Sequence, residues 1–328
     1  MTDPVLRVKN LTVSFASKNG DLTAVNGISY HLMAGEILAI VGESGCGKTV
    51  GALSILRLLP EPPGKIDSGC ITFNSRDLLQ LPPKELQKVR GKDIAMIFQD
   101  PMTSLNPVLT VGDQLMEPIL KHTSATQKEA WEQAVEVLRS VEIPSPREKM
   151  NQYPHQLSGG MRQRVMIGMA LTCSPKVLIA DEPTTALDVL IQAQIMGLLQ
   201  KLKEQTGMSI LLITHDLGMV TEIAQRIIVM YAGKIVESGP AGELFQTPLH
   251  PYTLGLKNSV PKPGRKMGPN KRLVEISGNV PSLHQLPSGC AFHPRCPSVM
   301  EKCKSETPVL RRVGQDREVS CWLEGAPT

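Results

Sequence analysis

The segment Gly42–Thr49 has the residue types and the spacing to hold phosphate groups. It fits the pattern G-x-x-x-x-G-K-[ST]. Glycines let a loop wrap closely, so that backbone N–H groups point at phosphate oxygens, and a helix beginning there adds the positive end of its dipole. Lys48 can reach the β- and γ-phosphates, and the Thr49 hydroxyl can ligate Mg²⁺. The candidate ATP contacts are Gly42, Glu43, Ser44, Gly45, Cys46, Gly47, Lys48 and Thr49.

Two adjacent carboxylates follow the apolar run 177–180. Such a run is typical of a strand buried in a sheet, and ligands of open α/β sheets bind at the carboxyl edge. We expect Asp181 to hold Mg²⁺ and to contribute to ATP binding, and Glu182 to polarise the attacking water as a general base. Two adjacent acidic residues usually lie on the solvated surface of a protein. This prediction therefore depends on the apolar strand before them and on the phosphate-binding segment.

The elements that must position these groups alternate along the chain. Strands are expected at 5–15, 37–41, 71–74, 94–98, 177–180 and 209–214. Helices are expected at 50–59, over most of 111–140 and at 191–203, and a hairpin at 227–236 turns at Ala232-Gly233. Strands that alternate with helices indicate a mainly parallel α/β core.

Length and composition exclude several classes of protein. The 328 residues suggest about two domains, and 41% hydrophobic residues leave ample material for a core. A net charge of +4, with only five Phe, four Tyr and two Trp, argues against a nucleic-acid partner. No apolar run reaches the roughly 18 residues of a membrane span, and residues 1–10 lack the features of a signal peptide.

The segment Leu157–Arg164 closely resembles the LSGGQ-type signature of ABC-transporter ATPases. Other motifs of that family follow in the same order: Gln99 resembles the Q-loop glutamine, 185–188 the D-loop and His215 the switch histidine. Phe15 resembles the aromatic residue that stacks on adenine, although a Phe in an alternating strand is more often part of the core. The resemblance covers roughly residues 5–260. The signature has Met161 where Gln is typical, which should leave its backbone and serine chemistry intact.

The resemblance implies a P-loop NTPase fold of the ABC type. An α/β core with an antiparallel β subdomain would span residues 1–256, with a helical subdomain at about 100–165, and a small cysteine-containing extension would span 257–328. In this family ATP lies between the phosphate-binding loop of one subunit and the signature of another, so a second ATPase subunit, different or identical, is required. The resemblance implies that the signature contacts the ATP bound by the partner subunit. The signature residues are Leu157, Ser158, Gly159, Gly160 and Met161.

The same resemblance assigns roles to individual residues. Glu182, His215 and Gln99 would be catalytic, and Asp188 would act in the D-loop. Mg²⁺ would be held by Thr49, Gln99 and Asp181.

Four further segments resemble the oligopeptide/dipeptide importer branch of the family, which includes nickel importers. They are residues 100–107, 250–253, 278–281 and 289–297. This branch implies an ATPase at the cytoplasmic face of the inner cell membrane, bound to two transmembrane permease subunits and coupled indirectly to a solute-binding protein. ATP binding would close the ATPase dimer and hydrolysis would reset it. The alternatives are transport of nickel or another small solute, or a soluble ABC ATPase of translation or DNA repair.

Four of the seven cysteines cluster near the carboxyl end of the chain. Cys290, Cys296, Cys303 and Cys321 have the spacing C-x₅-C-x₆-C-x₁₇-C. Zinc sites usually contain close C-x₂₋₄-C pairs, whereas four cysteines also ligate a [4Fe–4S] cluster, and the resemblance to peptide importers points to the cluster. Zinc and free or disulfide-bonded cysteines are the alternatives. We expect the remaining three cysteines to be inert thiols.

A basic segment precedes this cysteine region. Residues 257–272 contain six Lys or Arg, no acid, and several Pro and Gly. It is expected to be a linker, either a solvated loop or a segment that touches acidic lipid headgroups or a membrane partner.

Overall fold

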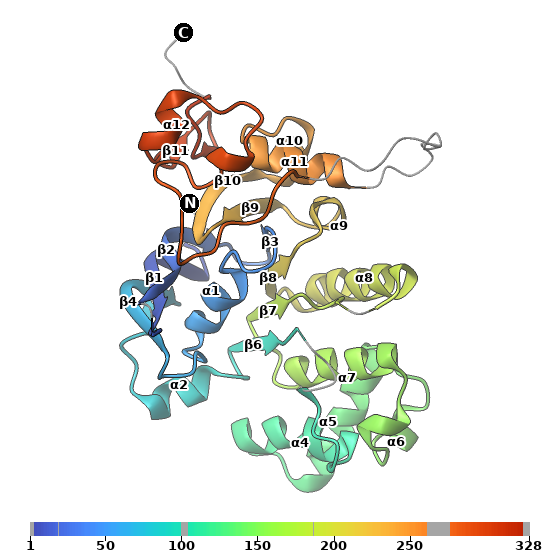
Figure 1. Ribbon diagram of the computed structural model, residues 1–328. Coiled ribbons are helices and arrows are strands. Elements are labelled where there is room, and N and C mark those ends of the chain that lie inside the picture. Colours follow the sequence, from blue (N-terminus) through green and yellow to red (C-terminus); the bar gives the residue numbers. More distant parts are fainter. Residues whose placement is uncertain (1–2, 19, 100–103, 186, 261–275, 324–328) are drawn as a thin grey trace. The chain divides into compact units, whose positions relative to one another are not determined.

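The computed structural model describes residues 3–18, 20–99, 104–185, 187–260 and 276–323 (Figure 1). The chain forms two compact units. The first comprises residues 1–6, 32–36 and 76–213, and the second comprises residues 7–31, 37–75 and 214–328. Over the described ranges, we find no helix with the length and apolar character that a membrane crossing requires.

Three parallel strands form the sheet of the first unit, in the order β8-β7-β6. Their bounds are β6 (Ile94–Ile97), β7 (Val177–Asp181) and β8 (Ser209–Thr214). Every residue of β7 and β8 is buried. Strands buried on both faces are apolar along their whole length, which is why these strands were recognisable from the sequence. The structure confirms the three strands expected here.

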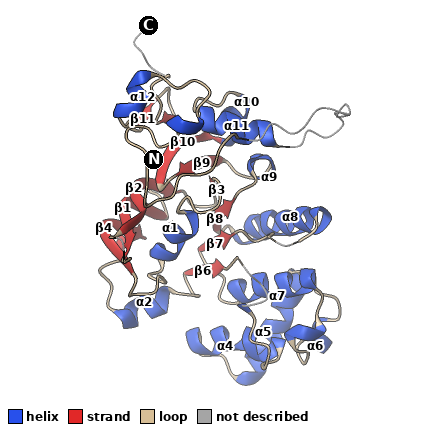
Figure 2. Ribbon diagram, viewed as in Figure 1, coloured by secondary structure: helices blue, strands red, loops and turns tan. Residues whose placement is uncertain are grey.

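Helices make up most of the rest of the first unit (Figure 2). They are α2 (Pro83–Val89), α4 (Val111–His122), α5 (Gln127–Ser140), α6 (Pro146–Lys149), α7 (Gly159–Leu171) and α8 (Val189–Thr206). The short β5 (Arg76–Asp77) and the 3₁₀ turn η1 (Pro154–Gln156) complete the unit. Thr110 and Thr126 begin α4 and α5 with capping boxes. Gly168 of α7 packs against Val137 of α5, so these helices share a core.

The second unit contains two groups of strands. In the first group, β2 (Leu22–Leu32), β1 (Leu6–Phe15) and β4 (Gly64–Phe73) lie in that order. The backbone N–H of Asn10 donates to Ser29 and that of Gly27 donates to Thr12, so β1 and β2 run antiparallel, as the resemblance implied for this subdomain. The sequence analysis did not predict β2, and it began β4 seven residues late, at Ile71.

The second group of strands joins the core to the carboxyl end of the chain, in the order β11-β12-β10-β9-β3. The strands are β3 (Ile37–Val41), β9 (Arg226–Tyr231), β10 (Lys234–Pro240), β11 (Arg311–Arg312) and β12 (Glu318–Val319). β3 and β9 are parallel, and β9 and β10 form the expected hairpin. Glu237 of β10 pairs with Val319 of β12, so the extension adds strands to the sheet of the core.

Short helices surround these strands in the second unit. They are α1 (Lys48–Ile55), α9 (Leu217–Thr221), α10 (Ala241–Gln246), α11 (Pro251–Ser259), the 3₁₀ turn η2 (His293–Arg295) and α12 (Glu301–Ser305). α1 ends before the expected Leu59, because Arg57 adopts a left-handed conformation with φ of 50°. Of the predicted basic linker, residues 261–272 lie outside the described residues.

Candidate functional site

The phosphate-binding segment connects β3 to α1 along a path that only glycine permits at two positions. A Cβ atom at Gly42 would lie 2.3 Å from the carbonyl oxygen of Met230. At Gly47, where φ is 98°, a Cβ atom would lie 2.3 Å from the carbonyl oxygen of Ala24. The glycines of the motif are therefore required by close packing of the loop against the neighbouring backbone.

Lys48 is held against this loop by two backbone carbonyls. Its Nζ donates to the carbonyl oxygen of Gly42 at 2.7 Å and to that of Glu43 at 3.0 Å, and the residue is 5% exposed. Cys46 lies beneath the ammonium group, and burial raises the pKa of its thiol. A neutral buried thiol is unreactive, which agrees with the expectation that Cys46 is an inert thiol.

In the first unit, the structure brings Gln99 and Glu182 together. Gln99 Nε2 donates to Glu182 Oε2 at 3.1 Å, and Thr185 Oγ1 donates to the same oxygen at 2.9 Å. Glu182 follows the buried Asp181 directly, and its N–H donates to the carbonyl oxygen of Ile213 at 2.8 Å. Its φ of 45° is uncommon for a residue other than glycine. Two hydrogen bonds therefore orient the carboxylate, and a third holds the backbone of the same residue. The sequence analysis assigned no contact to Thr185, although its place three residues after Glu182 was a usable signal.

The signature segment presents its serine and first glycine to solvent. Ser158 begins α7, and its Oγ accepts a hydrogen bond from the N–H of Met161 at 3.4 Å. Ser158 and Gly159 are exposed, and a Cβ atom at Gly159 would meet nothing within 4 Å. Within the same helix, the buried Gln163 donates to the carbonyl oxygen of Pro183. The signature helix is thus tied to the residues that follow Glu182.

The remaining predicted residues lie at the ends of elements. Asp188 begins α8, where its Oδ1 accepts from the N–H of Ile191 at 2.9 Å, and Ala186 of the D-loop lies outside the described residues. His215 follows β8 and is exposed. Phe15 ends β1, is half-buried and packs beside Gly64.

Comparisons with known proteins agree with these motifs. The sequence model of the ABC transporter family matches residues 25–185, and that of the oligopeptide/dipeptide transporter C-terminal region matches residues 236–303. The chain is 52% identical to the oligopeptide transport ATP-binding protein OppD of Escherichia coli, covering 94% of this chain and 90% of OppD. The chain belongs to the ABC-transporter ATPase family.

Other members of the family are similar over almost the whole chain. A probable peptide ABC transporter ATP-binding protein of Sinorhizobium fredii, y4tR, is 51% identical over 98% of this chain and 95% of its own length. The dipeptide transport ATP-binding protein DppD of Bacillus subtilis is 50% identical over 98% of this chain and 95% of its own length. One similar solved structure is that of the ATP-binding cassette MJ0796, a dimer in a post-hydrolysis state bound to ADP and Pi. The match has a TM-score of 0.65 and 29% sequence identity, and it covers 72% of this chain and 98% of that chain. The ABC ATPase is therefore an ATP-hydrolysing enzyme with the predicted α/β fold.

In the second unit, the four C-terminal cysteines line one cavity. Cys290, Cys296, Cys303 and Cys321 share its wall with Phe292. All seven cysteines of the chain are free of disulfide bonds, and burial raises the thiol pKa of Cys290 and Cys296. Among the residues that the structure describes, no three or more His, Cys, Asp or Glu side chains form a group that could hold a metal ion. Neither the predicted [4Fe–4S] cluster nor the alternative zinc ion is confirmed.

Proposed function

We propose that this ABC ATPase powers the import of di- or oligopeptides across the cell membrane. The observation that carries the proposal is the match of residues 236–303 to the C-terminal region of oligopeptide/dipeptide transporters. The relatives named above support it, since each is named for peptide, oligopeptide or dipeptide transport. Nickel or another small solute is the alternative cargo, because an ATPase subunit does not itself contact the solute.

For ATP hydrolysis we propose that each motif residue has one chemical task. Lys48 contacts the β- and γ-phosphates, and Glu182 takes a proton from the attacking water. Gln99 and Thr185, which donate to Glu182 Oε2, orient that carboxylate. His215 acts at the γ-phosphate, and Phe15 stacks on adenine. Thr49, Gln99 and Asp181 are the residues that would hold Mg²⁺, which would offset negative charge on the phosphates.

We propose that a second ATPase subunit, either identical or different, completes each nucleotide site. The exposed Ser158 and Gly159 support this, because they offer a hydroxyl and the amino end of α7 to a ligand outside this chain. At the start of α8, Val189 is 80% exposed and Leu190 is 78% exposed. Apolar side chains of this exposure beside the signature helix fit a surface that a partner covers when ATP binds.

The helical part of the first unit supports a contact with two permease subunits at the cytoplasmic face of the membrane. Val108 is 75% exposed and Leu109 is 38% exposed in the loop before α4, and Phe98, which follows β6, is 43% exposed. These residues bracket the segment after Gln99 that resembles the importer branch, of which residues 100–103 lie outside the described residues. A solute-binding protein would act on the ATPase indirectly, through the permeases.

The experiment that tests this function is purification and reconstitution of the whole transporter. The ATPase, expressed together with two candidate permease subunits, is expected to co-purify with them in mild detergent. In proteoliposomes carrying the solute-binding protein, di- or oligopeptides should stimulate ATP hydrolysis several-fold. Stimulation by nickel chelates but not by peptides would establish the alternative cargo. Failure to co-purify with any permease would instead favour a soluble ABC ATPase.

We further propose that the four C-terminal cysteines hold a [4Fe–4S] cluster. Their convergence on one cavity of the second unit supports this proposal. The irons of such a cluster are spread over a cube, so its thiolate ligands lie farther apart than the ligands of a single zinc ion. Four thiols on the wall of one cavity match the number of ligands that such a cluster takes. Bound there, it would connect segments of the extension that have little core of their own.

Anaerobic purification is expected to give a brown protein with broad absorbance near ~400 nm and about four iron and four sulfide per chain. Cys296→Ser should lose most of the colour, because serine is a poor ligand for iron. Cys70→Ser, which changes a thiol outside the cavity, is the matched control and should retain it. A colourless protein that contains one zinc per chain would contradict the cluster.

A further inference from the structure

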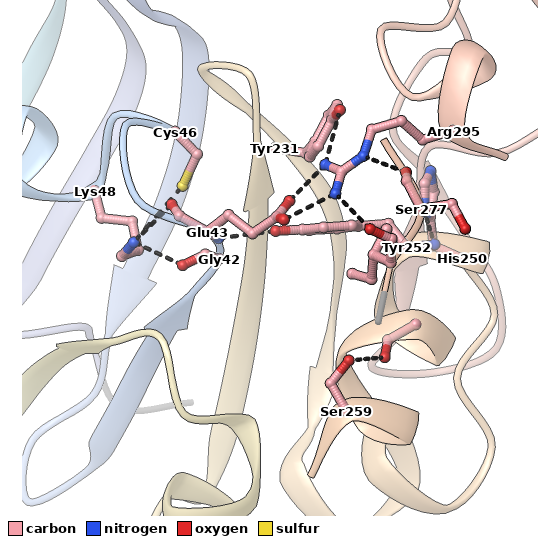
Figure 3. Close-up of polar contacts among 12 residues, drawn as sticks. Gly42, Glu43, Cys46, Lys48, Tyr231, His250, Tyr252, Ser259, Ser277 and Arg295 are labelled. Atoms are coloured by element: carbon pink, nitrogen blue, oxygen red, sulfur yellow. Dashed lines mark hydrogen bonds and ion pairs between the residues drawn. The ribbon is translucent and has the colours of Figure 1, made fainter. Parts of the chain in front are cut away.

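An arginine of the C-terminal extension reaches the phosphate-binding loop. Arg295 Nη1 donates to Glu43 Oε2 at 2.7 Å, and Nη2 donates to Glu43 Oε1 at 2.9 Å (Figure 3). The Arg295 side chain is 4% exposed and that of Glu43 is 27% exposed. A bidentate pair of this kind fixes both position and orientation, and its burial protects it from screening by salt.

The guanidinium group of Arg295 is itself held in place by the extension and by β9. Its Nε donates to the carbonyl oxygen of Ser277 at 3.0 Å, and Nη2 also donates to that of Ile276 at 3.3 Å. The group lies 5.9 Å from the ring centroids of Tyr231 and Phe292. Because most of its donors are satisfied, the arginine can act as a fixed support for Glu43 and not as a mobile surface charge.

A second contact fixes the backbone of the same glutamate. The N–H of Glu43 donates to Tyr252 Oη at 2.8 Å (Figure 3), and Tyr252 is fully buried. Tyr252 is fixed in turn, since its own N–H donates to His250 Nδ1 at 3.0 Å and its ring packs 5.3 Å from that of Phe292. Burial lowers the pKa of His250 to about 4, which keeps its ring neutral and able to accept this hydrogen bond.

Glu43 connects these supports to Lys48 of the phosphate-binding segment. Its carbonyl oxygen accepts from Lys48 Nζ at 3.0 Å, while its side chain and its N–H are held by Arg295 and Tyr252. A displacement of the Glu43 side chain would therefore move a carbonyl that positions the lysine ammonium. Arg295 precedes Cys296 of the cysteine cavity, so its location depends on how the extension folds.

We propose that Arg295 is a positioning residue for ATP binding, through which the C-terminal extension sets the conformation of the phosphate-binding loop. The proposal deepens the proposed ATPase function, on which it rests, by assigning part of the affinity for ATP to the extension. It requires neither a peptide cargo nor an occupied cysteine site. ATP affinity should depend on the Arg295–Glu43 pair, whereas turnover at saturating ATP should not.

The test compares Arg295→Gln, Arg295→Lys and Glu43→Gln with the unaltered full chain. Arg295→Gln and Glu43→Gln are each expected to raise the Kd for trinitrophenyl-ATP and the KM for ATP about 10-fold, with kcat within about two-fold of wild type. Arg295→Lys should recover part of the affinity, because lysine keeps the charge but not the bidentate geometry. The double variant should bind no more weakly than either single variant, since both remove one interaction.

Arg312→Gln is the matched control, because Arg312 is an exposed arginine of the same extension whose side chain donates to Gln315. It should bind ATP like wild type. Glu43→Gln leaves the extension untouched, so it keeps the test valid if Arg295→Gln fails to fold. Wild-type Kd and KM in Glu43→Gln, or losses that add in the double variant, would overturn the proposal. Binding is measured on the ATPase alone, so failure of peptide transport in the reconstituted system would not affect this result.

Discussion

Glu182→Gln is expected to lower ATP hydrolysis by at least about 100-fold while leaving the Kd for ATP within a few-fold of wild type. The substitution removes the negative charge and the proton acceptor but keeps the size of the side chain. In the structure, Oε2 of Glu182 accepts hydrogen bonds from Gln99 and Thr185, and a glutamine oxygen can accept the same two bonds. Local geometry should therefore survive, and the loss should be confined to the chemical step.

The measurement pairs phosphate release at saturating MgATP with equilibrium binding of ATP. Because hydrolysis would normally separate the subunits, the variant should also accumulate as an ATP-bound dimer, which light scattering detects. Thr185→Val is an informative comparison, since it removes one hydrogen bond to the carboxylate but keeps the base. It should lower kcat by about 10-fold. Glu222→Gln, at an exposed acid, is the neutral control. Wild-type turnover in Glu182→Gln would contradict the role of general base.

The parts of the candidate site that could be predicted from sequence are those whose chemistry is local. The glycine pattern of Gly42–Thr49 is required by contacts of the loop with neighbouring backbone, and β7 is buried on both faces, so both leave a continuous signal. The order of the motifs then identified the family. Contacts between residues close in sequence, such as the hydrogen bond from Thr185 to Glu182, could also have been predicted.

Contacts between distant segments could not be predicted in the same way. Arg295 and Glu43 lie 252 residues apart, and the local sequence around either residue does not indicate its partner. The pairing of β12 with β10 was missed for a related reason, because β12 has only two residues and too little alternation to indicate a strand. The four C-terminal cysteines line one cavity, but their spacing alone cannot specify which ion, if any, the thiols bind.

Arg317→Gln is expected to destabilise the second unit by about 3–5 kcal/mol, because it leaves a buried carboxylate without its partner. Glu237 on β10 has no exposed surface, and its Oε1 accepts from Arg317 Nη2 at 2.7 Å. The other hydrogen bonds to this carboxylate come from the N–H groups of Leu249 and His250, both at 2.9 Å. Neutral amides offset less of the cost of a buried charge than a guanidinium does. Arg317 also donates to the carbonyl oxygen of Thr247 at 2.7 Å, so the pair connects the extension to the segment before α11.

Urea unfolding followed by the fluorescence of Trp322 measures this loss in the unit concerned. The chain has two tryptophans, so a Trp131→Phe background removes the signal of α5 in the first unit. The double variant Glu237→Gln/Arg317→Gln should be more stable than Arg317→Gln, since it removes the unpaired charge. The single glutamine oxygen keeps an acceptor for one of the two backbone N–H groups, so recovery should be partial. Lys304→Gln, which breaks an exposed ion pair with Glu301 in the same unit, is the matched control and should unfold like the background protein. If Arg317→Gln unfolded at the same urea concentration as Lys304→Gln, the buried pair would not stabilise the attachment of the extension. Suppose instead that Arg317→Gln unfolded at a lower urea concentration and that the double variant recovered stability. The loss of stability in Arg317→Gln would then come from the uncompensated charge of Glu237 and not from lost packing of the arginine side chain.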